Sequence, residues 1–95
     1  MVKYLKEEDF NTVIKGKILV DFYADWCGPC KIMSEVLEKI DFIDVLKVNV
    51  DTFPEIAKKY GVMSIPTIIY FNEGEEITKK SGLCSISDLK EMVTK

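Results

Sequence analysis

The sequence contains no histidine and no arginine, and it has only three cysteines among its 95 residues. Histidine is the side chain most often used for acid–base chemistry near neutral pH and the commonest metal ligand, so any proton transfer must use other groups. Three cysteines are far fewer than a small disulfide-built domain carries, and an odd number leaves at least one unpaired within the chain. The small number of cysteines indicates a protein of a reducing environment. Its fold is expected to be stabilised by a hydrophobic core and not by disulfides.

Charge and hydropathy exclude two further classes of protein. Thirteen lysines and sixteen acidic residues give a net charge of -3, without a basic stripe that would hold a phosphate backbone, so nucleic-acid binding is not expected. The longest apolar runs are strand-sized, whereas a membrane-spanning helix needs about 20 apolar residues. The first eight residues become charged too early for a signal peptide. We therefore expect a cytoplasmic protein that does not insert into a membrane.

Apolar periodicity predicts alternating strands and helices in one domain. Strands are expected at 2–5, 17–23, 45–50, 67–71 and 76–80, and helices from 10 up to Gly16, from Cys30 to 40, from Pro54 to Gly61 and from Ser85 to 93. The strand at 17–23 lacks polar alternation, which indicates a central position covered on both faces. The early strands require parallel crossovers and the last two form a hairpin. The sequence therefore predicts an α/β fold with a mixed central sheet flanked by helices on both faces.

The motif that carries chemistry is Trp26-Cys27-Gly28-Pro29-Cys30, placed where the central strand ends and an amphipathic helix begins. At the helix N-terminus, Cys27 meets unpaired N–H groups and the positive end of the helix dipole, which favour its thiolate. The dipole supplies up to about 1 kcal/mol, less than one pKa unit, so a pKa near neutrality also requires hydrogen bonds to the sulfur. We predict that Cys27 attacks a substrate disulfide and that Cys30 then attacks Cys27 to release the reduced substrate.

Two charged residues stand inside otherwise apolar strands. Burial would raise the pKa of Asp21 through desolvation, which makes this carboxylate a candidate for accepting the proton of Cys30. Lys47 lies within the strand at 45–50 and would offset the charge of Asp21. The pattern leaves one alternative open for each residue. For Asp21 the alternative is a carboxylate that faces water at a frayed strand end. For Lys47 it is a solvated lysine at a strand edge.

Cys84 is the third cysteine, and it is assigned a packing role. A zinc site at the paired cysteines would need two further ligands, but only Cys84 remains and there is no histidine, so no metal is expected. An inert, structural cysteine pair is a further alternative. The capping-box pattern of Ser85 to Asp88 places Cys84 and Leu89 at the positions of a hydrophobic staple. We therefore expect Cys84 to pack as a small apolar side chain rather than to act as a regulatory thiol.

The segment from Val20 to Lys31 resembles the active-site segment of the thioredoxin family, and 47–51 and 64–67 resemble that family's third strand and cis-proline loop. The resemblance covers the whole chain and implies a single thioredoxin domain at 1–95. It also implies a protein-disulfide reductase in which Cys27 is the nucleophile, Cys30 the resolving thiol, Asp21 the buried acid and Lys47 its neighbour. The implied substrate surface consists of Trp26, Gly28, Pro29, Ile65, Pro66 and Gly82, with Pro66 preceded by a cis peptide bond.

The same resemblance implies the partners of the protein. These are disulfide-containing protein substrates and a thioredoxin reductase, with no cofactor beyond the Cys27–Cys30 pair, and the protein is expected to be a monomer. The chain departs from the family's usual pattern at Tyr23, where tryptophan is common, and at Glu35, where proline is usual. Two alternatives to a reductase remain, a thioredoxin-fold binding subunit or adaptor and a glutathione-linked, glutaredoxin-like oxidoreductase.

Overall fold

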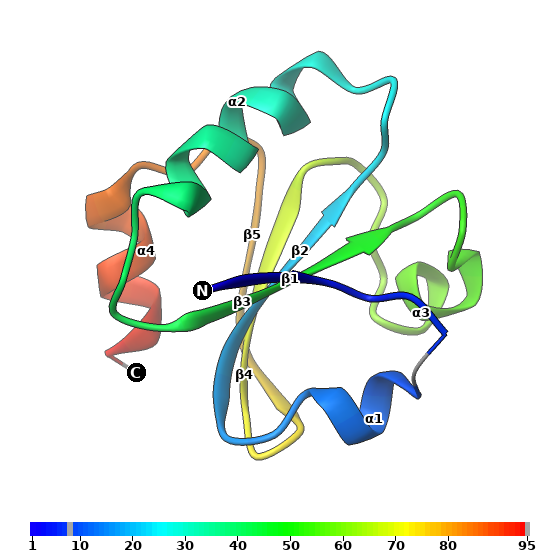
Figure 1. Ribbon diagram of the computed structural model, residues 1–95, viewed down its shortest axis with the longest axis horizontal. Helices are drawn as coiled ribbons and strands as arrows, with labels where there is room; N and C mark the ends of the chain where they lie inside the picture. Colours follow the sequence, from blue (N-terminus) through cyan, green and yellow to red (C-terminus); the bar gives the residue numbers. More distant parts are fainter. Residues whose placement is uncertain (8, 95) are drawn as a thin grey trace.

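The computed structural model describes residues 1–7 and 9–94, and within these residues five strands and four helices follow one another in the predicted order, with the last two strands consecutive (Figure 1). The strands are β1 (Val2–Tyr4), β2 (Lys17–Tyr23), β3 (Asp44–Asn49), β4 (Thr67–Asn72) and β5 (Glu75–Ser81). The helices are α1 (Phe10–Val13), α2 (Gly28–Glu38), α3 (Pro54–Lys59) and α4 (Ile86–Val93).

The strands form one mixed sheet in the order β1-β3-β2-β4-β5, so the predicted central position of β2 is confirmed. β2 pairs in parallel with β3 and antiparallel with β4, while β1 and β5 complete the two edges. In this register Asp21 on β2 lies beside Lys47 on β3 and beside Ile68 on β4. The sheet alone therefore brings together the two charged residues that the sequence places inside strands.

Helices cover both faces of the sheet, as predicted (Figure 1). On one face, Phe10 of α1 packs with Tyr60 and Phe71, whose ring centroids lie between 5.2 and 5.7 Å apart. On the other face, α2 and α4 bury Met33 and Leu89 against the sheet. Two apolar layers thus hold β2 between them, which explains why its sequence lacks polar alternation.

The start of α4 matches its predicted cap, whereas the end of α1 does not match its predicted boundary. The Ser85 hydroxyl accepts the Asp88 N–H at 3.0 Å and the Asp88 carboxylate accepts the Ser85 N–H at 2.9 Å, which confirms the capping box. Before this cap, Cys84 is 3% exposed in the same buried cluster as Leu89. By contrast, α1 stops at Val13, because buried Ile14 adopts a non-helical ψ of 64° before the chain turns.

Three segments that are distant in sequence converge at one end of the sheet. They are the connection from β2 to α2, the segment that follows β3, and the loop that leads into β4 (Figure 1). In the described part of the chain, no helix is long and apolar enough to cross a membrane.

Candidate active site

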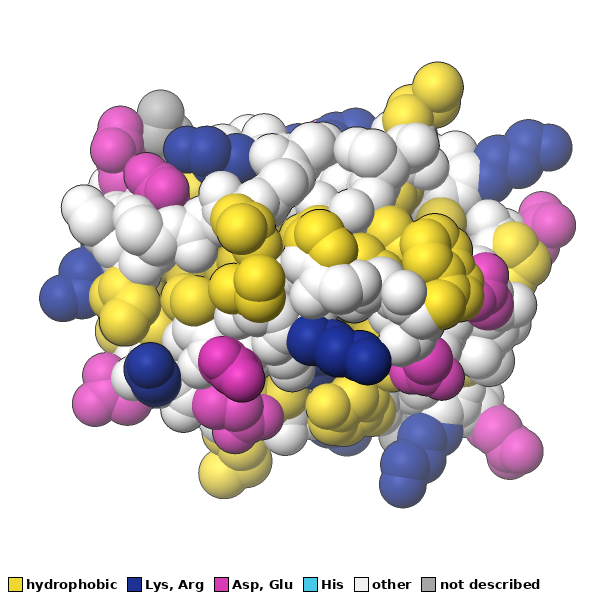
Figure 2. Space-filling model, turned by 90° about the horizontal axis from the view of Figure 1, so that it is seen from above, with side chains coloured by type: hydrophobic (Ala, Val, Ile, Leu, Met, Phe, Trp, Pro, Cys, Tyr) yellow, Lys and Arg dark blue, Asp and Glu magenta, His cyan; other side chains and the backbone are white. Residues whose placement is uncertain are grey.

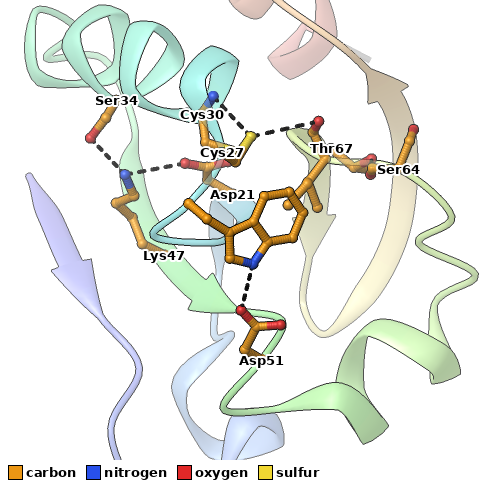
Figure 3. The surroundings of a disulfide bond; sticks show 10 residues. Asp21, Cys27, Cys30, Ser34, Lys47, Asp51, Ser64 and Thr67 are labelled. Carbon is orange, nitrogen blue, oxygen red and sulfur yellow. Dashed lines mark hydrogen bonds and ion pairs between the residues drawn. A yellow bond between two sulfur atoms is a disulfide. The ribbon is translucent and has the colours of Figure 1, made fainter.

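Cys27 and Cys30 form a disulfide at the beginning of α2, just beyond the end of β2 (Figure 3). Their Cα atoms are 5.2 Å apart, which is an ordinary separation for a disulfide. Cys27 is the N-cap of the helix, and Pro29 occupies the first turn, where a missing N–H leaves no hydrogen bond unmade. The backbone N–H of Cys30 donates to the Cys27 sulfur at 3.2 Å. This backbone donor is one of the hydrogen bonds that the predicted activation of the Cys27 sulfur requires.

The loop before β4 closes over the disulfide. The Cys27 sulfur lies 3.9 Å from the carbonyl oxygen of Ile65, and the Ile65–Pro66 peptide bond is cis. The carbonyl of Pro66 in turn accepts the N–H of Gly82 at 2.8 Å. Gly82 has φ +88°, a conformation that favours glycine over other residues. Ile65, Pro66 and Gly82 therefore form one connected support beside the sulfurs.

An apolar groove of about 400 Å³ opens next to Cys27. It is lined by Trp26, Val50, Ala57, Val62, Met63, Ser64 and Ile65. Figure 2 shows hydrophobic side chains gathered in a band across this end of the molecule. Trp26 and Met63 are 71% and 95% exposed, so the rim of the groove offers accessible apolar surface for a partner to cover.

The six residues of the predicted substrate surface lie at the same end of the molecule, but they differ in how far they are exposed to solvent. Trp26 and Ile65 line the groove, and Gly28 and Pro29 are exposed at the start of α2. Pro66 is buried and Gly82 is half-buried, so these two support the surface more than they expose it.

Asp21 is completely buried beneath this surface, which rules out the alternative that it faces water at a frayed strand end. Desolvation raises the pKa of this carboxyl group to about 6, and the charge of Lys47 opposes that rise. The Lys47 ammonium lies 3.4 Å from the carboxylate and is 3% exposed, so the alternative of a solvated lysine at a sheet edge is also wrong. Figure 3 shows Asp21 beneath the disulfide and the Lys47 side chain extending from β3 toward both Asp21 and Ser34.

Lys47 has further partners that sequence reasoning missed. Its ammonium donates to the Ser34 hydroxyl at 2.6 Å and lies over the Tyr23 and Tyr4 rings, 4.7 and 5.5 Å from their centroids. A pocket of about 180 Å³ borders both Lys47 and Cys30 on this side. Ser34 follows Cys30 by four residues on α2, and this spacing is the signal that would have placed both on one helix face.

Asp51 and Met63 are two more residues of the site that the motif did not reveal. The carboxylate of Asp51 accepts the indole N–H of Trp26 at 2.9 Å, which orients the exposed ring beside the groove (Figure 3). Met63 borders the groove from the loop before β4. The sequence marks Asp51 only as the last residue of the segment at 47–51, and no local pattern distinguishes Met63 from other apolar loop residues.

The third cysteine, Cys84, takes no part in the disulfide. Cys84 is buried, its sulfur lies 3.8 Å from the carbonyl of Gly82, and burial raises the pKa of its thiol. A raised pKa keeps the thiol protonated and therefore a poor nucleophile. This geometry agrees with the predicted packing role.

Comparisons with known proteins find relatives that match most or all of this chain. The family model described as Thioredoxin matches residues 1–95. Among curated proteins, the chain is 46% identical to a thioredoxin of Chlamydia caviae over 88 residues, covering 87% of this chain and 86% of that protein. It is 44% identical to a thioredoxin of Staphylococcus epidermidis over 95 residues, covering 94% and 91%. Among solved structures, a mutant thioredoxin of Halobacterium salinarum superposes with a TM-score of 0.85 at 34% identity, covering 97% of this chain and 87% of that one.

Proposed function

Because the chain belongs to the thioredoxin family, we propose a role for each side chain of the site in the family's reaction. Family membership makes the protein a thiol–disulfide oxidoreductase that acts on protein disulfides and has a reductase as a partner in general. The main support for these roles is the position of the Cys27–Cys30 disulfide, which lies at the start of α2 beside an apolar groove.

Cys27 is the nucleophile of the first step. Its thiolate attacks one sulfur of the substrate disulfide, so a Cys27–substrate bond forms, and the other substrate sulfur leaves with the electron pair of the broken bond. Two features support this assignment: the sulfur caps the N-terminus of α2 and accepts the Cys30 N–H, and both favour negative charge. It also lies against Ile65, at the edge of the groove.

Cys30 resolves the mixed disulfide. It loses its proton to the Asp21 carboxylate, and its thiolate attacks the Cys27 sulfur, so the Cys27–Cys30 bond forms and the remaining substrate sulfur leaves as a thiolate. Cys30 is 2% exposed, which favours an acceptor inside the protein over bulk water. A carboxyl group with a pKa of about 6 suits that transfer near neutral pH, and Lys47 offsets the negative charge of Asp21 before the proton arrives.

The substrate segment lies on the surface formed by Trp26, Gly28, Pro29, Ile65, Pro66 and Gly82. An extended, partly apolar segment fits this surface, since the groove beside it is lined mainly by apolar side chains. The reductase that renews the dithiol is a thioredoxin reductase. The protein works as a monomer in the cytoplasm and uses no cofactor, because the two sulfurs themselves carry both electrons of the exchange.

Reduction of insulin by dithiothreitol tests this proposal. The wild type is expected to accelerate the reaction, whereas Cys27→Ser falls to the rate without protein. Cys84→Ala is the matched control, since it removes a cysteine outside the proposed site and retains the wild-type rate. Equal acceleration by the wild type and Cys27→Ser would contradict the assignment.

A further inference from the structure

The Lys47 ammonium lies between two oxygen-bearing side chains and is closer to the neutral one. It donates a hydrogen bond to the Ser34 hydroxyl at 2.6 Å, but it is 3.4 Å from the Asp21 carboxylate. Among the described residues, neither Asp21 carboxylate oxygen has a hydrogen-bond partner, although the side chain is completely buried. The shorter of these two contacts of the buried cation is therefore made with the helix and not with its counter-charge.

The fold explains this arrangement. Asp21 and Lys47 are register partners on adjacent parallel strands, so their side chains project from the same face of the sheet. Helix α2 crosses that face and carries Ser34 one turn after Cys30 (Figure 3). The Lys47 side chain extends from the sheet toward the helix, where Tyr23 and Tyr4 flank its ammonium. Cys30, Ser34 and Lys47 all border the same pocket.

We propose that Ser34 is a positioning residue that holds the Lys47 ammonium toward α2 and thereby keeps the ion pair with Asp21 weak. The inference rests on the proposed role of Asp21 as the acceptor of the Cys30 proton. A buried carboxylate that lacks a close counter-charge binds a proton more readily than a well-paired one. Ser34 thus strengthens Asp21 as a base without contacting the reacting sulfurs.

Several ionisable groups face Asp21, Lys47 or the pocket beside them, and they come from β1, β2, β3, α2 and the segments that precede α2 and α4. They are Lys47 on β3, Tyr23 on β2, Tyr4 on β1, Cys30 and Lys31 on α2, Asp25 in the connection before α2, and Cys84 before α4. Lys47 is the group whose charge opposes the effect of burial on Asp21. The position of its ammonium therefore controls the proton affinity of the carboxyl group.

Carbon-13 NMR of the Asp21 carboxyl carbon tests the inference in the oxidised protein, where the paired cysteines do not titrate. In Ser34→Ala the ammonium loses its hydroxyl acceptor and moves toward the carboxylate, so the Asp21 midpoint is expected about half a pH unit or more below the wild-type value. Ser34→Thr retains a hydroxyl and is expected to keep the wild-type midpoint. A midpoint in Ser34→Ala that equals or exceeds the wild-type value would overturn the inference.

Stopped-flow release of substrate from the mixed disulfide provides a second readout. The rate-against-pH curve of Ser34→Ala is expected to move to lower pH with the Asp21 midpoint, and its plateau to fall, because a weaker base accepts the proton less readily. An unmoved curve despite a moved midpoint would show that Ser34 does not act on the reaction. If Asp21→Asn leaves release unchanged, the proposed role of Asp21 fails, while the NMR titration still decides whether Ser34 positions Lys47.

Discussion

At the scale of single residues, Asp21 is the side chain whose environment departs furthest from what its chemistry favours. It is fully buried, carries no hydrogen bond from any described residue, and has a single cation at 3.4 Å. Desolvation affects the Asp21 carboxylate more than the charge of Lys47 does, so its ionised form is less favourable inside the protein than in water. The fold therefore retains Asp21 at a cost in stability, which is understandable if the carboxyl group takes part in the reaction.

Asp21→Asn is expected to change how stability depends on pH. The folded-state pKa of about 6 lies above the ordinary value of 3.8, so between these values the folded protein binds a proton that the unfolded chain has released. The contribution of Asp21 to the free energy of unfolding therefore falls as pH rises from about 4 to 6, by an amount on the order of 3 kcal/mol. Asparagine does not titrate and lacks this loss.

Urea unfolding of both proteins between pH 4 and pH 8 measures the effect. The difference in unfolding free energy is expected to shift in favour of Asp21→Asn with increasing pH and to level off above the folded-state pKa. The constant part of the difference includes the consequence of leaving Lys47 without its counter-charge. A difference that stays flat across this range would show that Asp21 is not protonated in the folded protein at pH 4 to 6.

At the scale of elements, sequence patterns correctly predicted interactions between residues that are only a few positions apart. The spacing of Cys27 and Cys30 predicted their pairing at the start of α2, and the Ser85 pattern predicted the cap of α4. The end of α1 differs from the prediction, because the apolar spacing continues to Ile14 while the backbone leaves the helical conformation at that residue. The apolar face predicted for this segment is buried as expected, and only the boundary of the helix differs.

The cap of α4 leads to a prediction about its contribution to stability. Ser85→Ala removes the side-chain acceptor of the capping box, and we expect the free energy of unfolding to fall by about 1 kcal/mol. Ser87→Ala is the matched control, because Ser87 is exposed in the same turn and lies outside the cap. Urea denaturation at neutral pH compares the two variants. Equal stability of Ser85→Ala and Ser87→Ala would mean that the capping box adds nothing measurable.

At the scale of the whole molecule, function depends on three chain segments meeting at one end of the sheet. The order of strands and helices predicted this mixed sheet, because parallel crossovers and a terminal hairpin admit few arrangements. Side-chain contacts between different elements could not be predicted from local sequence patterns. The Ser34–Lys47 hydrogen bond and the Trp26–Asp51 hydrogen bond join residues 13 and 25 positions apart, and they depend on how the helix and loops pack on the sheet.

The central claim is that Cys27 attacks the substrate and Cys30 resolves the resulting intermediate, and trapping that intermediate tests it most directly. Cys30→Ser and Cys27→Ser, each with Cys84→Ala, are incubated with a disulfide-containing peptide and analysed by mass spectrometry after proteolysis. Cys30→Ser is expected to accumulate a mixed disulfide at Cys27, while Cys27→Ser accumulates little, since only the Cys27 sulfur caps α2 and accepts the Cys30 N–H, which favour its thiolate. A predominant adduct on Cys30, or none in Cys30→Ser, would contradict the account.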